Sequence, residues 1–375
     1  MLSSVDHRRL AGTGFLMIVL VLYIHAMGPL DKSSKMDVAL SIQTFVGNGI
    51  ARVAVPFYFL VSGLLFFNSV PTCNPAAAIA AKIRRRLGSL LVPYLAWSAL
   101  GMLLFLTLAK LPGLEAHFRH PDNRIAGMTP FALLARWVIH PVPGQLWFLR
   151  DLLLMTVASP AIASILKPSR SILRIIVLIT LGVWWLQVGC GPPRERGLIS
   201  SDAMFFFTLG AVVSKVGLDR LKALRCGRIA ALLTVSWLSL ICVESAFALG
   251  YGWSSVRHLI VLVGIPATWC LALRSDRLWN NVKYQSLTSM TFFVFVAHQP
   301  AMALSKKVVF ARTEGELAFT TAYLLLPLIL LAILIVAGTT IRQCLPACFR
   351  LLNGGRGSMR TAANTQHSVV QICHE

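Results

Sequence analysis

The sequence predicts an all-α protein, a polytopic membrane protein with about ten transmembrane helices. Of its 375 residues 56% are hydrophobic and only 13% are charged, and the mean hydropathy of +0.71 is too high for a water-soluble chain. The apolar residues gather in windows of about twenty, the length that crosses a bilayer as a helix. Lys and Arg fall in short clusters between these windows, which is the usual pattern of membrane topology.

The ten spans follow from reading these windows along the chain. They cover residues 10–30, 44–67, 87–108, 146–166, 172–190, 202–217, 229–250, 256–273, 287–305 and 318–341. The first is too long for the apolar core of a signal peptide, so we expect it to be retained. Most Lys and Arg residues fall on one side when the N-terminus is placed inside, which predicts that both termini are cytoplasmic.

Two segments outside the spans stand out. Residues 110–145 contain five prolines and three histidines and form the longest loop, on the outer side, where an acceptor could be engaged. We expect a transmembrane domain over residues 1–345 and a basic, disordered cytoplasmic tail over residues 346–375.

The composition also excludes some partners. The net charge of +21 invites comparison with nucleic-acid binders, but those concentrate their basic residues on one face or arm. We therefore expect membrane lipids and no nucleic acid. The eight cysteines lack the paired spacing of a metal site, so we expect neither a bound metal nor structural disulfides.

His25 is the most conspicuous side chain in the first span. An ionisable group near hydrocarbon is costly, and by default it is a candidate functional residue. An imidazole there could serve as a base or as an acyl-transfer partner. The alternative, that His25 is hydrogen-bonded between helices for packing, stays open.

Other polar residues are expected at a similar outer depth. Arg52 lies in the second span, Trp147, Arg150 and Asp151 open the fourth, and His298 lies inside the ninth. All could face one cavity. In the structural alternative Arg150 pairs with Asp151 or Asp202, Arg52 extends to the outer surface, and His298 packs through a hydrogen bond.

A basic run, Arg84, Arg85 and Arg86, precedes the third span at the inner surface. It could simply fix the orientation of that helix. It could also bind cytoplasmic phosphates, because guanidinium groups match phosphate oxygens, and coenzyme A carries such phosphates.

Residues 15–307 together resemble the membrane-bound acyltransferase-3 family, which moves acyl groups onto surface polysaccharides and other envelope acceptors. The similar stretches occur in the family's order: residues 15–25 ending in His25; Arg52 with Pro56 and Ser62-Gly63; Arg84–Arg86 with Pro93-Tyr94 and Trp97; Trp147 to Asp151; residues 205–210; and residues 292–300 with His298. One departure is Gly14, where the family commonly has Arg or Lys; Arg9 is the nearest basic residue.

The resemblance implies a multi-pass O-acyltransferase of the bacterial inner membrane. Acyl-CoA, commonly acetyl-CoA, would be the donor substrate, with no permanently bound cofactor, and Arg84–Arg86 and Arg9 would hold it. A surface glycan or lipid-linked saccharide would be the acceptor, against Trp147 and Asp151. His25, Arg150, Arg52 and His298 would form the catalytic set. A transporter or flippase component, or a related protein without catalysis, remains the alternative.

Overall fold

A computed structural model describes residues 3–30, 36–71, 75–108, 110, 127–188, 198–216, 227–248 and 254–356; helices dominate these ranges, and no strand occurs in them. The helices are α1 (Ser4–Ala26), α2 (Asp37–Gln43), α3 (Ala54–Asn68), α4 (Pro75–Leu108), α5 (Pro130–Val138), α6 (Trp147–Val157), α7 (Ser159–Ile165), α8 (Ser171–Val188), α9 (Ser201–Val216), α11 (Gly227–Ala248), α12 (Ser254–Arg274), α13 (Asp276–Trp279), α14 (Val282–Thr288), α15 (Thr291–Phe310), α16 (Glu316–Cys344) and α17 (Pro346–Leu352).

Each of the ten predicted spans falls on a helix or on a bent pair of helices. Seven helices in the described ranges are long and apolar enough to cross a membrane, or nine if each of two bent pairs is one span. The predicted sixth span corresponds to α9, which has 16 residues. At 1.5 Å per residue it is about 24 Å long, shorter than the hydrocarbon core.

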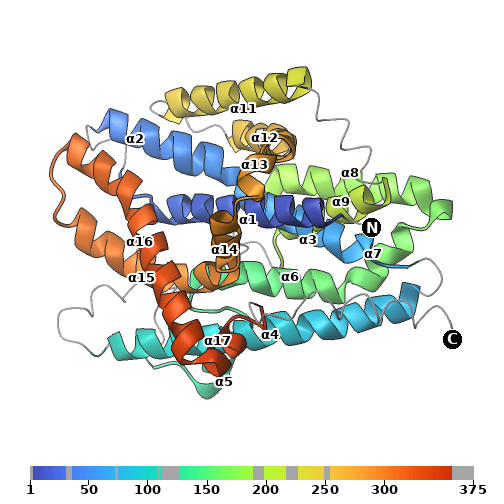
Figure 1. Cartoon of the computed structure of the whole chain (residues 1–375), viewed down its shortest axis with the longest axis horizontal. Coiled ribbons are helices and arrows are strands. Elements are labelled where there is room, and N and C mark those ends of the chain that lie inside the picture. Colours follow the sequence, from blue (N-terminus) through green and yellow to red (C-terminus); the bar gives the residue numbers. More distant parts are fainter. Residues whose placement is uncertain are drawn as a thin grey trace.

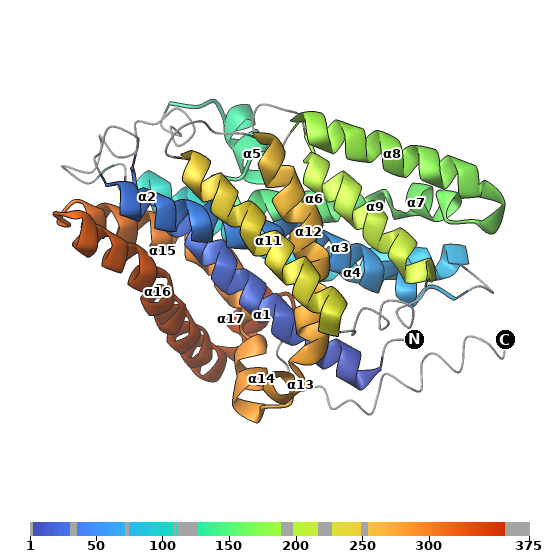
Figure 2. The ribbon, with the colours of Figure 1, turned by 90° about the horizontal axis from the view of Figure 1, so that it is seen from above.

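The first helix lies at the centre of the bundle, with α11 and α12 on one side and α4 and α6 on the other (Figure 1). It packs against α3, α15 and α16. The helix begins at Ser4, earlier than the hydrophobic window, because Ser3 and Asp6 form a reciprocal capping box. The view from above shows α8 and α9 at one end and α16 at the other (Figure 2).

The pair α3 and α9 is held together by two glycines. A Cβ atom on Gly63 would lie 2.0 Å from the carbonyl oxygen of Phe207, and one on Gly210 would lie 2.0 Å from that of Leu60. The two backbones therefore touch, as small residues allow between membrane helices. This contact fixes α3, which carries Tyr58, against α9, which carries Asp202.

Two spans are broken, and one is irregular. Helices α6 and α7 meet at 55° ahead of Pro160, and α14 and α15 meet at 56°. The second span contains a π-helix (Thr44–Gly49) and then a 3-10 helix (Ile50–Val53) between α2 and α3. Gly49 permits this close passage, since a Cβ atom there would lie 2.3 Å from Ile241.

The C-terminal region is more ordered than the sequence predicts. Residues 346–352 form α17, and residues 353–356 make a turn in which Gly354 and Gly355 have φ of +63° and +74°. Glycine accepts this left-handed backbone without strain. Gly354 and Gly355, which in the sequence favour a disordered tail, therefore form a turn. Residues 357–375 lie outside the described residues.

Candidate active site

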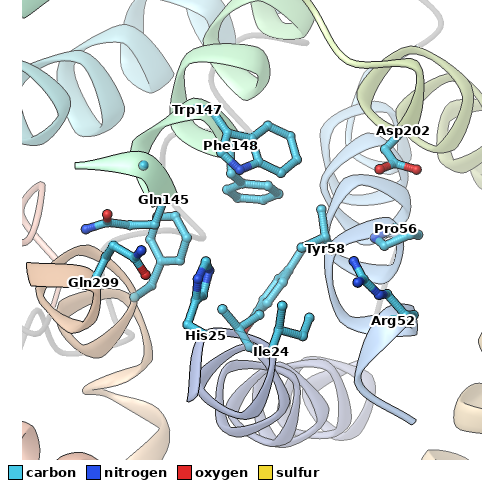
Figure 3. Close-up of a pocket in the computed structure, with 14 residues that line it drawn as sticks. Ile24, His25, Arg52, Pro56, Tyr58, Gln145, Trp147, Phe148, Asp202 and Gln299 are labelled. Atoms are coloured by element: carbon cyan, nitrogen blue, oxygen red, sulfur yellow. The ribbon is translucent and has the colours of Figure 1, made fainter. Parts of the chain in front are cut away.

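A cavity of about 280 Å³ lies between α1, α3, α6 and α15. Figure 3 shows His25 projecting into it from α1, with Trp147 and Phe148 across from it, Gln299 on one side and Tyr58 and Arg52 on the other. Its remaining lining residues are Val21, Ile24, Val55, Pro56, Gly144, Gln145, Asp202 and Phe295. Of the six residues expected at one depth, His25, Arg52 and Trp147 line this cavity.

His298 lies directly beside His25. The ring centroids are 5.1 Å apart and the rings are tilted by 46°. The Nδ1 atom of His298 is 2.6 Å from the carbonyl oxygen of Phe295, so Nδ1 carries the proton and donates it there. Its Nε2 atom is buried and has no hydrogen-bond partner in the described part of the chain, so a lone pair is left as an acceptor.

Arg52 reaches the cavity because of the irregular helix that precedes it. The 3-10 segment Ile50–Val53 carries Arg52, and its Nη2 atom donates to Oδ1 of Asn48 over 2.5 Å. Irregular turns of this kind are frequent at functional sites. Arg52 and the ammonium group of Lys306 both act electrostatically on the imidazole of His25.

Arg150 and Asp151 lie outside this cavity and form a buried ion pair, as the structural alternative proposed. Nε and Nη2 of Arg150 donate to Oδ1 of Asp151 over 3.1 and 3.0 Å, and Nη1 donates to the carbonyl of Ile139 over 2.8 Å. The other carboxylate oxygen of Asp151 accepts the Ser200 N–H over 2.8 Å. The pair ties the start of α6 to Ile139, which follows α5, and to Ser200, which precedes α9.

Three aromatic rings lie in a row along one part of the cavity wall. Tyr58 and Phe148 meet edge to face with centroids 5.9 Å apart, and Phe148 meets Phe295 in the same way at 5.4 Å. These three side chains also line a second cavity of about 370 Å³, toward the start of α15. We call the three residues the aromatic partition and the second space the inner cavity.

The expected donor-binding arginines lie in different surroundings. Arg84 and Arg85 are exposed, whereas Arg86 turns inward and its Nη2 donates to the carbonyl of Ser62 over 3.4 Å. Arg9 forms an ion pair with Asp276 through bonds of 2.8 and 3.0 Å. Arg9 lies five residues before Gly14, about 7.5 Å along α1, so its role in place of a basic residue at position 14 stays a prediction.

Several polar residues at the site were not anticipated. Gln145 donates from Nε2 to the carbonyl of Val296 over 2.8 Å, and Gln299 follows His298. The Tyr58 hydroxyl donates to the carbonyl of Gly14. Ionisable residues inside apolar spans stand out in the sequence, whereas these side chains are uncharged. Tyr58 and Gln299 nevertheless lie within the stretches that resemble the acyltransferase-3 family. Among the predicted loop histidines, His117 and His120 lie outside the described residues.

The site contains no group that could hold a metal ion: clusters of three or more His, Cys, Asp or Glu are absent from the described ranges. The cavity wall carries the imidazole of His25, with that of His298 beside it, the guanidinium of Arg52, the carboxylate of Asp202, amide side chains and aromatic rings.

Comparison with known proteins gives a family and a relative. The model of a family described as an acyltransferase domain matches residues 15–341. The chain is 25% identical over 333 residues to the succinoglycan biosynthesis protein ExoH of Rhizobium meliloti (strain 1021), covering 86% of this chain and 84% of that protein. No solved structure matches.

Proposed function

Since the chain belongs to the acyltransferase-3 family, we propose that it is an O-acyltransferase that moves an acyl group, acetyl in the first instance, from acyl-CoA to a hydroxyl of an exopolysaccharide or other surface glycan. The similarity to a protein of succinoglycan biosynthesis supports a polysaccharide acceptor, free or lipid-linked. The apolar helices support a multi-pass membrane protein, and we assign it to the bacterial inner membrane.

One observation carries this proposal: the imidazole of His25 lines the first cavity, and that of His298 lies beside it and 6.1 Å, centroid to centroid, from Phe295 of the aromatic partition, which also lines the inner cavity. A donor that enters from the inner side and an acceptor that enters from the outer side would meet there. Neither a transporter nor a protein without chemistry needs paired imidazoles at that point.

In the proposed reaction His25 acts as the general base. Its free ring nitrogen takes the proton of the acceptor hydroxyl while the hydroxyl oxygen attacks the thioester carbonyl carbon. The C–O bond forms, the C–S bond breaks, and the leaving sulfur takes the proton from the imidazolium. A transient acyl-imidazole, formed by attack of the same nitrogen on the thioester, is the covalent alternative.

The neighbouring residues have supporting roles in this proposal. Arg52 would stabilise the developing oxyanion, because a guanidinium at the cavity wall offers preorganised positive charge. Trp147 would provide a stacking face for a sugar ring. Arg150 and Asp151 are assigned a positioning role at the start of α6, since their charges are engaged with each other. Arg84–Arg86 would attract the donor's phosphates.

The test is transfer of radiolabelled acetyl from acetyl-CoA to exopolysaccharide by the protein in liposomes. His25→Ala should lower the rate by about 100-fold or more, the scale of a lost general base. His7→Ala, on the exposed first turn of the same helix, is the matched control and should transfer normally. Normal transfer by His25→Ala would remove His25 from the mechanism; no transfer by the wild-type protein would favour the transporter or noncatalytic alternative.

A further inference from the structure

The inner cavity has one charged lining residue, Arg356, which lies in the turn after α17. Its guanidinium stacks 4.1 Å above the Phe292 ring centroid, and its Nη1 donates to the carbonyl of Ser89 over 3.0 Å. Hydroxyl groups line the same space: Ser62, Thr288, Ser289 and Thr291. Most of the lining is apolar, so the guanidinium of Arg356 supplies the positive charge of this cavity.

Two further guanidinium groups contact residues of this lining. Nη1 of Arg342, on α16, lies 3.5 Å from the hydroxyl of Ser289, and Nη2 of Arg86, on α4, donates to the carbonyl of Ser62 over 3.4 Å. Arg86 and Arg356 repel each other electrostatically. One positive charge therefore lines the cavity, and two more, from α4 and α16, each contact a residue of its lining.

Within the described residues none of these three arginines forms an ion pair with a carboxylate. Partly buried like charges without a counter-charge are costly, and an anion between them would remove the cost. Burial lowers the pKa of Arg356 to about 10, so the group stays protonated at neutral pH while lacking a compensating negative charge.

The turn that carries Arg356 is fixed against α4 by close packing and hydrogen bonds. Gly354 packs so closely that a Cβ atom would lie 2.1 Å from the Ser89 carbonyl oxygen. The fully buried Asn353 donates from Nδ2 to the Arg356 carbonyl over 2.7 Å, and Nε1 of Trp97 donates to the Leu352 carbonyl over 3.0 Å. The position of Arg356 is thus specified by contacts with α4.

We propose that Arg356, together with Arg342 and Arg86, binds the phosphate groups of the acyl-CoA donor, so that the C-terminal turn forms part of the donor site. This inference rests on the proposed function. The donor's acyl arm would run from the inner cavity past the aromatic partition toward His25. Phe292, under the guanidinium of Arg356, and His298 are six residues apart, about 9 Å along α15.

The experiment measures coenzyme A binding by titration calorimetry, and donor KM and kcat by acetyl transfer, on the full-length protein in nanodiscs. Arg356→Ala should weaken coenzyme A binding and raise the donor KM by about tenfold or more, with kcat within twofold, because a charge-assisted hydrogen bond is lost. Arg356→Lys should recover part of the affinity. Arg342→Ala, on another helix, should weaken binding without touching the turn.

Arg350→Ala is the matched control, since Arg350 is an exposed cation on α17 outside the cavity. Coenzyme A affinity like that of wild type in both Arg356→Ala and Arg342→Ala would overturn the inference while leaving the proposed function standing. Equal loss in Arg350→Ala would also overturn it, since general charge would then explain the effect. A third outcome would also overturn the inference. If the wild-type protein transfers acetyl, and Arg356→Ala keeps its coenzyme A affinity but loses bound phospholipid phosphorus, the arginines bind a lipid headgroup instead.

Discussion

The imidazole of His298 lies 5.1 Å from that of His25, centroid to centroid, and is oriented by the Phe295 carbonyl. The unpartnered Nε2 of His298 costs free energy unless a ligand or a neighbouring ring uses it. The ninth predicted span therefore contacts the first through two neighbouring imidazole rings.

His298→Ala should lower acetyl transfer by about 100-fold if Nε2 relays a proton or orients His25. The measurement is the initial rate in liposomes, normalised to protein amount, beside His25→Ala and His7→Ala. A rate like that of wild type in His298→Ala, with His25→Ala inactive, would assign His298 to packing.

Arg150→Ala should destabilise the fold by about 3 kcal/mol, because Asp151 would remain as a buried charge without its partner. The double variant Arg150→Ala, Asp151→Asn should be less destabilised than Arg150→Ala alone. Thermal unfolding in detergent gives both values. A normal melting temperature with lost activity in Arg150→Ala would instead give Arg150 a chemical role.

Gly63→Ala should prevent normal packing of α3 on α9, since the new methyl group would meet the Phe207 carbonyl at 2.0 Å. We expect strongly reduced amounts of folded protein by size-exclusion fluorescence. Gly88→Ala is the control: nothing lies within 4 Å of its Cβ position on α4. That change should be neutral or stabilising by about 0.5–1 kcal/mol, and a similar loss in both variants would refute the packing argument.

His140, in the segment after α5, predicts a pH dependence. Desolvation lowers its pKa below 6.5, and the charges of Arg150 and Arg136 lower it further. The unfolded chain therefore binds a proton more readily, so this group's contribution to stability is present above pH 6.5 and is lost as the pH falls toward the folded-state pKa. His140→Gln should reduce the fall in melting temperature between pH 7.5 and 5; identical slopes would contradict this.

Hydropathy alone located every predicted span on a helix, because length and apolarity are sufficient for that. It missed the ends that depend on specific contacts: the capping box of Ser3 and Asp6 extends α1, and the breaks ahead of Pro160 and Thr291 divide two spans. The location of the termini remains a prediction.

The site was predicted in part for a similar reason. A titratable residue in an apolar run is visible in the sequence, so His25, Arg52 and His298 can be named as candidates; the first two line the cavity and His298 lies beside His25. Whether a charge is free depends on tertiary partners: Asp151 and the Ile139 carbonyl engage Arg150. Arg356 was assigned to a disordered tail because composition does not show that Gly354 fits against Ser89.

The aromatic partition has a consequence for the cell's energy supply. A passage that lets a thioester reach across a coupling membrane would also leak protons if water filled it from end to end. Tyr58, Phe148 and Phe295 meet edge to face where they line both cavities, so on the proposed function we predict that the donor's uncharged chain passes between these rings while they exclude hydrated ions.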